Sequence, residues 1–155
     1  MQARKVIAAV GGIAVVAVAT AQGEARPAQT GPGQIRITDV QTSYALVKSR
    51  RGNHGAGSIE LVKQRLYNPS ISSKPIGRAT LMCTYFDAQD RACSGTYFLP
   101  KGSLVVTGAI QSRLLYQIAV VGGTGLYDNA RGTLTVTSTG LRPKRREVLL
   151  FRLTG

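Results

Sequence analysis

The feature that most constrains this chain of 155 residues is a series of short runs rich in Val, Ile, Leu, Thr and Tyr, separated by turn residues. Runs of this kind, bounded by Gly, Pro, Asn, Asp or Ser, are typical of β-strands. Eight such runs are predicted, with no amphipathic helix: 35–47, 58–67, 77–87, 92–99, 102–110, 116–122, 132–139 and 146–154. Because parallel neighbours need a long crossover, the short connections favour antiparallel pairing. The sequence therefore predicts an all-β domain, either a sandwich or a closed barrel.

The two cysteines support the strand prediction independently. Cys83 and Cys93 lie five residues either side of Ala88, so a hairpin that turns at Ala88 places them directly opposite one another. Opposed Cα atoms in an antiparallel pair are about 4.5 to 5.5 Å apart, within the range that a disulfide spans. We therefore predict a structural disulfide. A metal or redox thiol site fits less well, because no histidine is near and the spacing is not Cys-x-x-Cys.

The first residues have the pattern of a secretory signal. A short basic head precedes an uncharged apolar run at 6–18, and a small-x-small cleavage pattern ends at Ala21. The stretch behind it is rich in Gly, Pro and Gln, which is typical of disorder. The predicted parts are a signal peptide at 1–21, a disordered leader at 22–34 and one domain at 35–155, secreted to the extracellular space or cell envelope. An uncleaved anchor is the alternative, although a membrane span needs about 20 residues.

The chain is strongly basic, with a net charge of +13. Removal of residues 1–21, which hold two bases and no acid, leaves +11. The bases gather in two predicted loops, at Lys48, Arg50 and Arg51 and at Arg142, Lys144, Arg145 and Arg146. A solvated surface is the ordinary interpretation, and docking on an anionic polymer is the alternative. No aromatic residues are interleaved with these bases as they are in single-strand binders, so we predict no nucleic-acid partner. We also predict no membrane partner after signal cleavage.

Several classes of site are excluded by residue counts. His54 is the only histidine and lies in a predicted Gly-rich loop, so a Ser-His-Asp triad would depend on one poorly placed base. A histidine-rich metal site is excluded, and no phosphate-binding Gly-x-x-x-x-Gly-Lys loop occurs. We therefore predict no metal and no cofactor. A ligand site in a barrel lumen remains, because eight strands enclose an interior that side chains fill or that holds one small ligand.

The run at 119–132 joins an apolar segment to a Thr/Val-rich one through Gly-Gly-Thr-Gly. A dinucleotide-binding fingerprint would need a third glycine where Asp128 stands and a helix behind it, whereas β-branched residues follow. Residues 120–132, VVGGTGLYDNARG, instead resemble the signature loop of the allene oxide cyclase and dirigent β-barrel superfamily. Weaker similarity extends from Ile35 to the C-terminus. The resemblance favours a single eight-stranded antiparallel barrel over a sandwich.

The same resemblance implies a function carried by the lumen. Allene oxide cyclases hold an apolar fatty-acid epoxide and steer its cyclisation without a cofactor, and dirigent proteins guide the coupling of phenolic intermediates. Both depend on orientation and exclusion of water. The resemblance thus implies a small hydrophobic substrate or ligand. If the protein is an enzyme, the resemblance implies a cofactor-independent isomerase. It also implies a homo-oligomer, which in this family is commonly a trimer. A lipocalin-like carrier of an apolar ligand is the alternative.

The resemblance also implies site residues. Asp39 and Gln41 match an acid-x-carboxamide pair on the first strand of the cyclases, and Arg131 matches the arginine of the dirigent Ala-Arg-Gly, which makes all three catalytic candidates. The candidates for ligand contact are Tyr85, Tyr127 and Asp128. A lumenal Asp39 beside Arg131 would act as general acid or base, since burial raises a carboxyl pKa and an arginine lowers it. The alternative roles are structural: Asp39 caps a strand end, and Arg131 pairs with Asp128.

One departure limits what the resemblance implies. The Gly-Ser-Pro that follows the first strand in plant cyclases has no match in Arg51-Gly52-Asn53-His54. The formation of a cyclopentenone from an epoxide is therefore not expected of this chain in particular.

Overall fold

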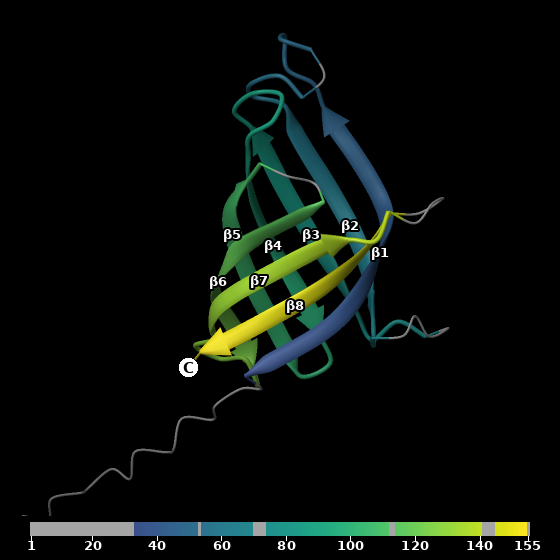
Figure 1. Cartoon of the computed structure of the whole chain (residues 1–155), viewed down its shortest axis with the longest axis vertical. Coiled ribbons are helices and arrows are strands. Elements are labelled where there is room, and N and C mark those ends of the chain that lie inside the picture. The colour runs from purple at the N-terminus through teal and green to yellow at the C-terminus, as the bar shows by residue number, and fades with distance from the viewer. Residues whose placement is uncertain (1–32, 53, 70–73, 112–113, 141–144, 155) are drawn as a thin grey trace, which may run out of the picture.

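The computed structural model describes residues 33–52, 54–69, 74–111, 114–140 and 145–154, which form a closed barrel of antiparallel strands (Figure 1). The strands are β1 (Gln34–Val47), β2 (Ile59–Tyr67), β3 (Gly77–Tyr85), β4 (Arg91–Leu99), β5 (Gly102–Ile110), β6 (Leu115–Gly125), β7 (Arg131–Ser138) and β8 (Arg146–Thr154). Each strand pairs with its neighbours in sequence, and β8 pairs with β1 to close the ring. The predicted barrel is confirmed, and the sandwich is excluded.

The N-terminal predictions lie outside this description. The signal peptide at 1–21 and the leader as far as residue 32 fall on residues that the structure does not describe. Gln34, which the sequence assigned to the leader, already begins β1. No helix among the described residues has the length and apolar character of a membrane span.

The observed strands follow the predicted ones closely, and the largest difference is in β6. This strand continues through the Gly-Gly-Thr-Gly sequence to Gly125, whereas the predicted strand ended at Gly122. Gly123 pairs with Leu104 in the sheet, and a Cβ on it would lie 2.2 Å from the carbonyl oxygen of Tyr127. The glycines therefore let the β6–β7 turn fold back tightly on a strand that is still paired. A turn at 126–130 follows, not a helix.

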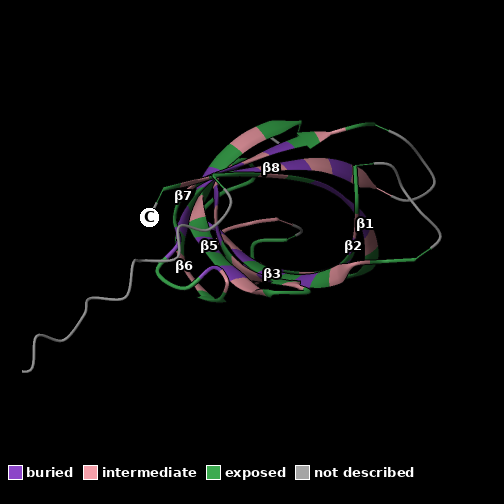
Figure 2. Ribbon diagram, turned by 90° about the horizontal axis from the view of Figure 1, so that it is seen from below, coloured by how far each residue is buried: buried purple, intermediate pink, exposed green. Residues whose placement is uncertain are grey.

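Alternate side chains of each strand point into the barrel, as the two-residue period of a strand requires. Figure 2 shows buried and exposed residues alternating along the strands. Toward the β6–β7 turn the lumen is filled by apolar side chains that are fully buried: Leu66, Tyr97, Leu104, Leu134 and Phe151. Tyr127, which is 7% exposed, comes from the turn itself and joins this core. We call this end of the lumen the apolar half.

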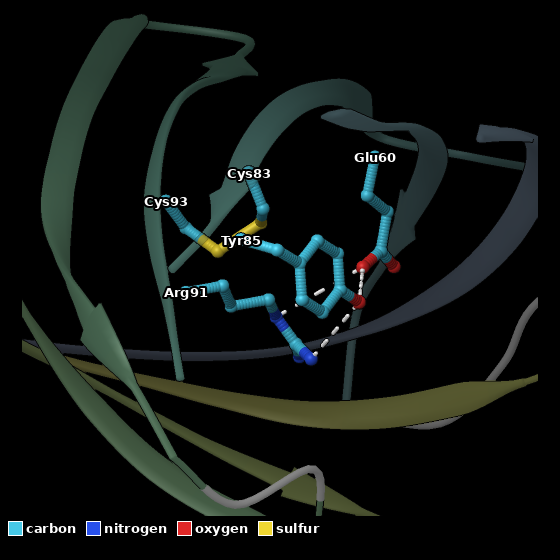
Figure 3. Close-up of a disulfide and its surroundings, with 5 residues drawn as sticks. All are labelled: Glu60, Cys83, Tyr85, Arg91 and Cys93. Atoms are coloured by element: carbon cyan, nitrogen blue, oxygen red, sulfur yellow. Dashed lines mark hydrogen bonds and ion pairs between the residues drawn. A yellow bond between two sulfur atoms is a disulfide. The ribbon is translucent and has the colours of Figure 1, made fainter. Parts of the chain in front are cut away.

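A disulfide joins the β3–β4 hairpin as predicted. Cys83 lies directly opposite Cys93, and their Cα atoms are 4.0 Å apart. The turn between the strands is held by Asp87, whose carboxylate accepts hydrogen bonds from the backbone N–H groups of Gln89 and Asp90 at 2.7 and 2.8 Å. Both cysteines are buried, so the bond faces the lumen (Figure 3). Disulfides of this kind are typical of proteins in oxidising compartments.

Candidate functional site in the barrel lumen

The end of the lumen opposite the β6–β7 turn is polar. Three of the seven acids in the chain, Asp39, Glu60 and Glu147, are buried there, together with Gln64 and Arg91. Each occupies an inward position that an apolar residue would fill in an ordinary core; Glu147, for example, precedes Leu149 and Phe151 on the inner face of β8. Burying a charge costs several kcal/mol unless it is well paired. We call this end the polar half and treat it as the candidate site.

Two carboxyl groups meet where β1 and β8 pair. Asp39 lies directly opposite Glu147, and the backbone N–H of Glu147 donates to Asp39 Oδ1 at 3.0 Å. Glu147 has further partners: Arg145 Nε lies 2.9 Å from its Oε1, and Gln64 Nε2 donates to its Oε2 at 3.4 Å. Asp39 Oδ2 is buried without a hydrogen-bond partner among the described residues. Glu147 is therefore the better-stabilised anion of the two.

The electrostatics separate the roles of these two acids. Burial raises the pKa of Asp39 well above its usual value, and the neighbouring Glu147 raises it further. Burial also raises the pKa of Glu147, but Arg145 and the hydrogen bond from Gln64 offset part of that increase. Two carboxyl groups in one low-dielectric site cannot both ionise easily. The pKa of Asp39 is therefore the more strongly raised of the two, and Glu147 has the partners that favour its charged form.

A second cluster lies two residues beyond the disulfide, where Tyr85 and Arg91 face each other at the end of the hairpin (Figure 3). The Tyr85 hydroxyl donates to Glu60 Oε2 at 2.5 Å, and Arg91 NH1 donates to the Tyr85 oxygen at 3.4 Å. Arg91 Nε lies 3.9 Å from Glu60 Oε2 and makes no hydrogen bond within the described residues. One donor of a buried guanidinium is therefore left for another acceptor.

The β1–β2 loop folds over this cluster. The backbone of Tyr85 exchanges hydrogen bonds with it, accepting from Gly57 at 2.8 Å and donating to Ser58 at 2.9 Å. The ring of His54 lies 4.9 Å from the ring of Tyr85, between centroids. His54 was predicted to lie in a Gly-rich loop, and the structure places that loop beside Tyr85 at the edge of the polar half.

A cavity of about 30 Å³ lies between the carboxyl pair and the Tyr85 cluster. Its polar lining residues are Gln41, Glu60, Gln64, Arg91, Tyr116, Arg145 and Glu147, and Val62, Leu81, Cys83 and Ile110 supply the apolar wall. This volume accommodates a water molecule or two, not a whole organic ligand. The Arg145 side chain is 31% exposed and marks the way to solvent. The space beside Glu147 therefore admits a small group only, unless Arg145 moves aside.

The predicted catalytic residues are brought together only in part. Asp39 and Gln41 share one face of β1, as their spacing predicted; Asp39 is buried in the lumen and Gln41 lines the cavity. Arg131 is exposed at the start of β7, where its NH1 donates to the carbonyl of Ala130 at 3.0 Å. The expectation that Arg131 lies beside Asp39 is wrong, because alternation along β7 turns Leu134 inward and Arg131 outward.

The strand register gives the distance between Arg131 and Asp39 along the barrel wall. On β8, Asp39 is opposite Glu147 and Arg131 is opposite Thr154, which lie seven residues apart, or about 23 Å along the strand. Arg131 also forms no ion pair with Asp128 within the described residues. A catalytic role for Arg131 stays a prediction without a partner in the polar half.

The three predicted ligand residues do not share one site. Tyr85 is buried in the polar half, Tyr127 packs in the apolar half, and Asp128 is exposed in the β6–β7 turn. The residues that sequence reasoning missed are Glu60, Gln64, Arg91, Tyr116, Arg145 and Glu147. The available signal was a charged residue at an inward position of an alternating strand, as with Glu60 between Ile59 and Leu61. No cluster of three or more potential metal ligands occurs among the described residues.

No protein-family model matches the sequence, and no curated protein matches it. Solved structures do match the fold. A pyocyanin demethylase is 20% identical with a TM-score of 0.68, covering 78% of this chain and 99% of that one. A pterocarpan synthase dirigent protein is 15% identical with a TM-score of 0.65, covering 88% and 96%. The Diels–Alderase AbmU from Streptomyces koyangensis is 17% identical with a TM-score of 0.62, covering 78% and 64%. The predicted resemblance to dirigent-like barrels is confirmed at the level of the fold.

Proposed function

We propose that this dirigent-like barrel promotes a redox-neutral rearrangement of a small organic molecule, an isomerisation or a cyclisation, at the polar half of its lumen. The observation that supports it most is the buried pair of Glu147 and Asp39 beside a cavity that Glu147 lines, with Arg145 and Gln64 bound to Glu147. Burial raises the pKa of both acids, and the pKa of Asp39 is raised further by Glu147. Carboxyl pairs with divergent protonation are characteristic of acid–base sites. Proteins of the same fold named as a dirigent synthase and a Diels–Alderase support the guidance of a cyclisation.

In this proposal Glu147 is the catalytic base. Its carboxylate accepts a proton from one atom of the substrate and returns that proton to another, so the substrate changes its bonding with no net transfer of electrons. Arg91 lines the same cavity, and its Nε–H, which makes no hydrogen bond within the described residues, stabilises negative charge that develops on a substrate oxygen. The neutral Tyr116 completes the wall, since burial keeps its pKa above the usual value.

Asp39 acts as a positioning residue. It is 0% exposed and lies behind Glu147, not on the cavity, so it acts on the substrate only through its neighbour. Its Oδ1 holds the Glu147 backbone, and while protonated it leaves the negative charge on Glu147. This role refines the sequence prediction that made Asp39 itself catalytic.

The test begins with native mass spectrometry of protein isolated from its own host, which identifies any molecule retained in the lumen. Turnover of that molecule is then compared in Glu147→Gln and Arg131→Ala. General-base catalysis contributes about 10² to 10⁴ in rate, so Glu147→Gln should lose that factor while Arg131→Ala stays within twofold. Asp39→Asn should shift the pH–rate profile. The opposite result, with Arg131→Ala inactive and Glu147→Gln active, would overturn the proposal in favour of the site inferred from the signature loop.

The apolar-carrier alternative has less support. The empty space in the lumen lies among charged residues, and the apolar half is filled by side chains such as Tyr97 and Phe151. A carrier of the lipocalin type needs an apolar cavity of a few hundred Å³. Glu147→Gln would leave the affinity of a carrier for its ligand nearly unchanged, whereas an acid–base site loses turnover.

We also propose that the protein is exported. The lumenal disulfide and the signal-like residues 1–21 both support this proposal. N-terminal sequencing of protein from its host should begin near Gln22; a chain that begins at Met1 would contradict cleavage.

A further inference from the structure

We propose a second binding site, on the outer wall of the barrel, for a small amphipathic anion that combines an aromatic body with one carboxylate. The site is a groove of about 470 Å³ that crosses the ends of β2, β3 and β4. We call it the outer groove; its main lining residues are Arg65, Ile76, Arg78, Phe98, Leu99 and Pro100. Sites for small molecules typically enclose about 300 to 1,000 Å³.

Two arginines face each other across the outer groove. Arg65 on β2 lies directly opposite Arg78 on β3, and both are exposed. Like charges directly opposite on a sheet destabilise it unless a counter-charge lies between them. The Arg78 guanidinium carbon also sits 4.5 Å from the centre of the Phe98 ring, and Phe98 is opposite Arg78 on β4. A cation–π contact of this kind holds the guanidinium against the aromatic side of the groove.

No acid among the described residues pairs with these two arginines. The acids on the strands all point into the lumen, and those of the described turns are Asp87, Asp90 and Asp128, none of which lines the groove. The β2–β3 connection, residues 68–76, contains no Asp or Glu. Both ion pairs found among the described residues belong to the polar half. The counter-charge for Arg65 and Arg78 must therefore come from outside the domain.

The floor of the outer groove is apolar and indicates which kind of group the ligand carries besides its carboxylate. Ile76, Leu99 and Pro100 are apolar, and Phe98 is 36% exposed. A Cβ on Gly77 would lie 2.1 Å from the carbonyl oxygen of Phe98, so β3 and β4 run close together under the groove with no side chain between them. Guanidinium groups bind carboxylates in a planar, two-pronged geometry and stack on aromatic faces. An aromatic carboxylate satisfies both the arginine pair and this floor.

The test is isothermal titration calorimetry of the full chain with 2-naphthoate at low salt. Arg65→Gln/Arg78→Gln should weaken binding at least tenfold, and Phe98→Ala at least threefold. The matched control is Arg36→Gln/Arg152→Gln, which removes the same charge from exposed positions on β1 and β8 and should change the affinity less than twofold. Neutral 2-naphthamide should bind at least tenfold more weakly than naphthoate.

The proposal would be overturned by equal losses in the two double variants, which indicate a general charge effect, by equal binding of the neutral amide, or by no binding at millimolar naphthoate. Glu147→Gln separates this site from the lumen. It should leave naphthoate binding unchanged, and loss of binding in that variant would place the probe in the polar half instead. The result does not depend on whether the lumen is catalytic.

Discussion

The apolar and polar halves of the lumen are built by the same strands but are filled on opposite principles. In the apolar half, Tyr97 and Phe151 meet edge to face at 5.2 Å between ring centres, and no side chain there carries a charge. In the polar half, buried acids and Arg91 leave Asp39 Oδ2, Gln64 Oε1 and Arg91 Nε without hydrogen-bond partners among the described residues. Buried apolar side chains fill one end, and three buried polar atoms lack hydrogen-bond partners at the other.

The difference indicates where the stability of the barrel comes from. Full burial of a Leu or Phe side chain stabilises a fold by about 1.5 to 3 kcal/mol, whereas a buried unpaired polar group costs about 1 to 3 kcal/mol. The apolar half therefore supplies most of the packing energy that stabilises the closed barrel. That energy offsets the cost of the unpaired polar groups in the polar half. Such a division is expected where a site needs charges that the fold alone does not need.

The largest expected effect is in the apolar half. Phe151→Ala should lower the free energy of unfolding by about 3 to 5 kcal/mol, because it opens a cavity and removes the contact with Tyr97. Denaturant unfolding measures the loss, and Phe151→Leu, which keeps most of the volume, should lose much less. A loss in Glu147→Gln as large as that in Phe151→Ala would contradict the division between the halves.

The disulfide should have the next largest effect. Cys83→Ala/Cys93→Ala removes a bond that closes a short loop, and chain entropy gives a loss of at most about 2.5 to 3 kcal/mol. Denaturant midpoints with and without a thiol reductant measure it. Reductant should destabilise the native protein by the same amount and leave the double variant unaffected. No difference between the two proteins would mean that the hairpin at Asp87 forms fully without the bond.

A smaller effect is expected from one hydroxyl group. Tyr85→Phe removes the donor that Glu60 uses and leaves a buried carboxylate short of a partner, which should lower stability by about 1 to 3 kcal/mol. Tyr127→Phe is the matched control from the apolar half, where the hydroxyl makes no side-chain hydrogen bond within the described residues. It should stay within about 0.5 kcal/mol of the native protein in thermal unfolding. Equal losses would show that both halves depend on polar contacts.

The last prediction concerns pH. Because the pKa of Asp39 is raised in the folded protein, the folded state binds more protons than the unfolded state between the ordinary aspartate pKa, about 3.9, and the raised value. Stability therefore falls as pH rises through that window, by at most about 1.4 kcal/mol per pH unit for one proton. Asp39→Asn removes this loss. Its stability relative to the native protein should be lowest below about pH 4 and increase toward neutral pH; a pH-independent difference would contradict the raised pKa.

The sequence by itself determined the strands, their antiparallel order and the disulfide, because each depends on local information. Turn residues and two-residue alternation define β5 and β8 to the residue, and equal spacing about Ala88 aligns Cys83 with Cys93. The spacing of Asp39 and Gln41 likewise predicted that both face the same side. The choice of a barrel over a sandwich needed the resemblance as well.

Only the tertiary structure decided which face is inside and which residues meet. The alternation of side chains along β7 places Arg131 and Leu134 on opposite faces of the strand. Which of these faces points outward depends on how the sheet closes into a barrel. Asp39 and Glu147 lie far apart in the sequence and become neighbours only when β8 pairs with β1. The candidate site is therefore a consequence of register around a closed sheet, and register is a property of strand pairs that no single strand carries.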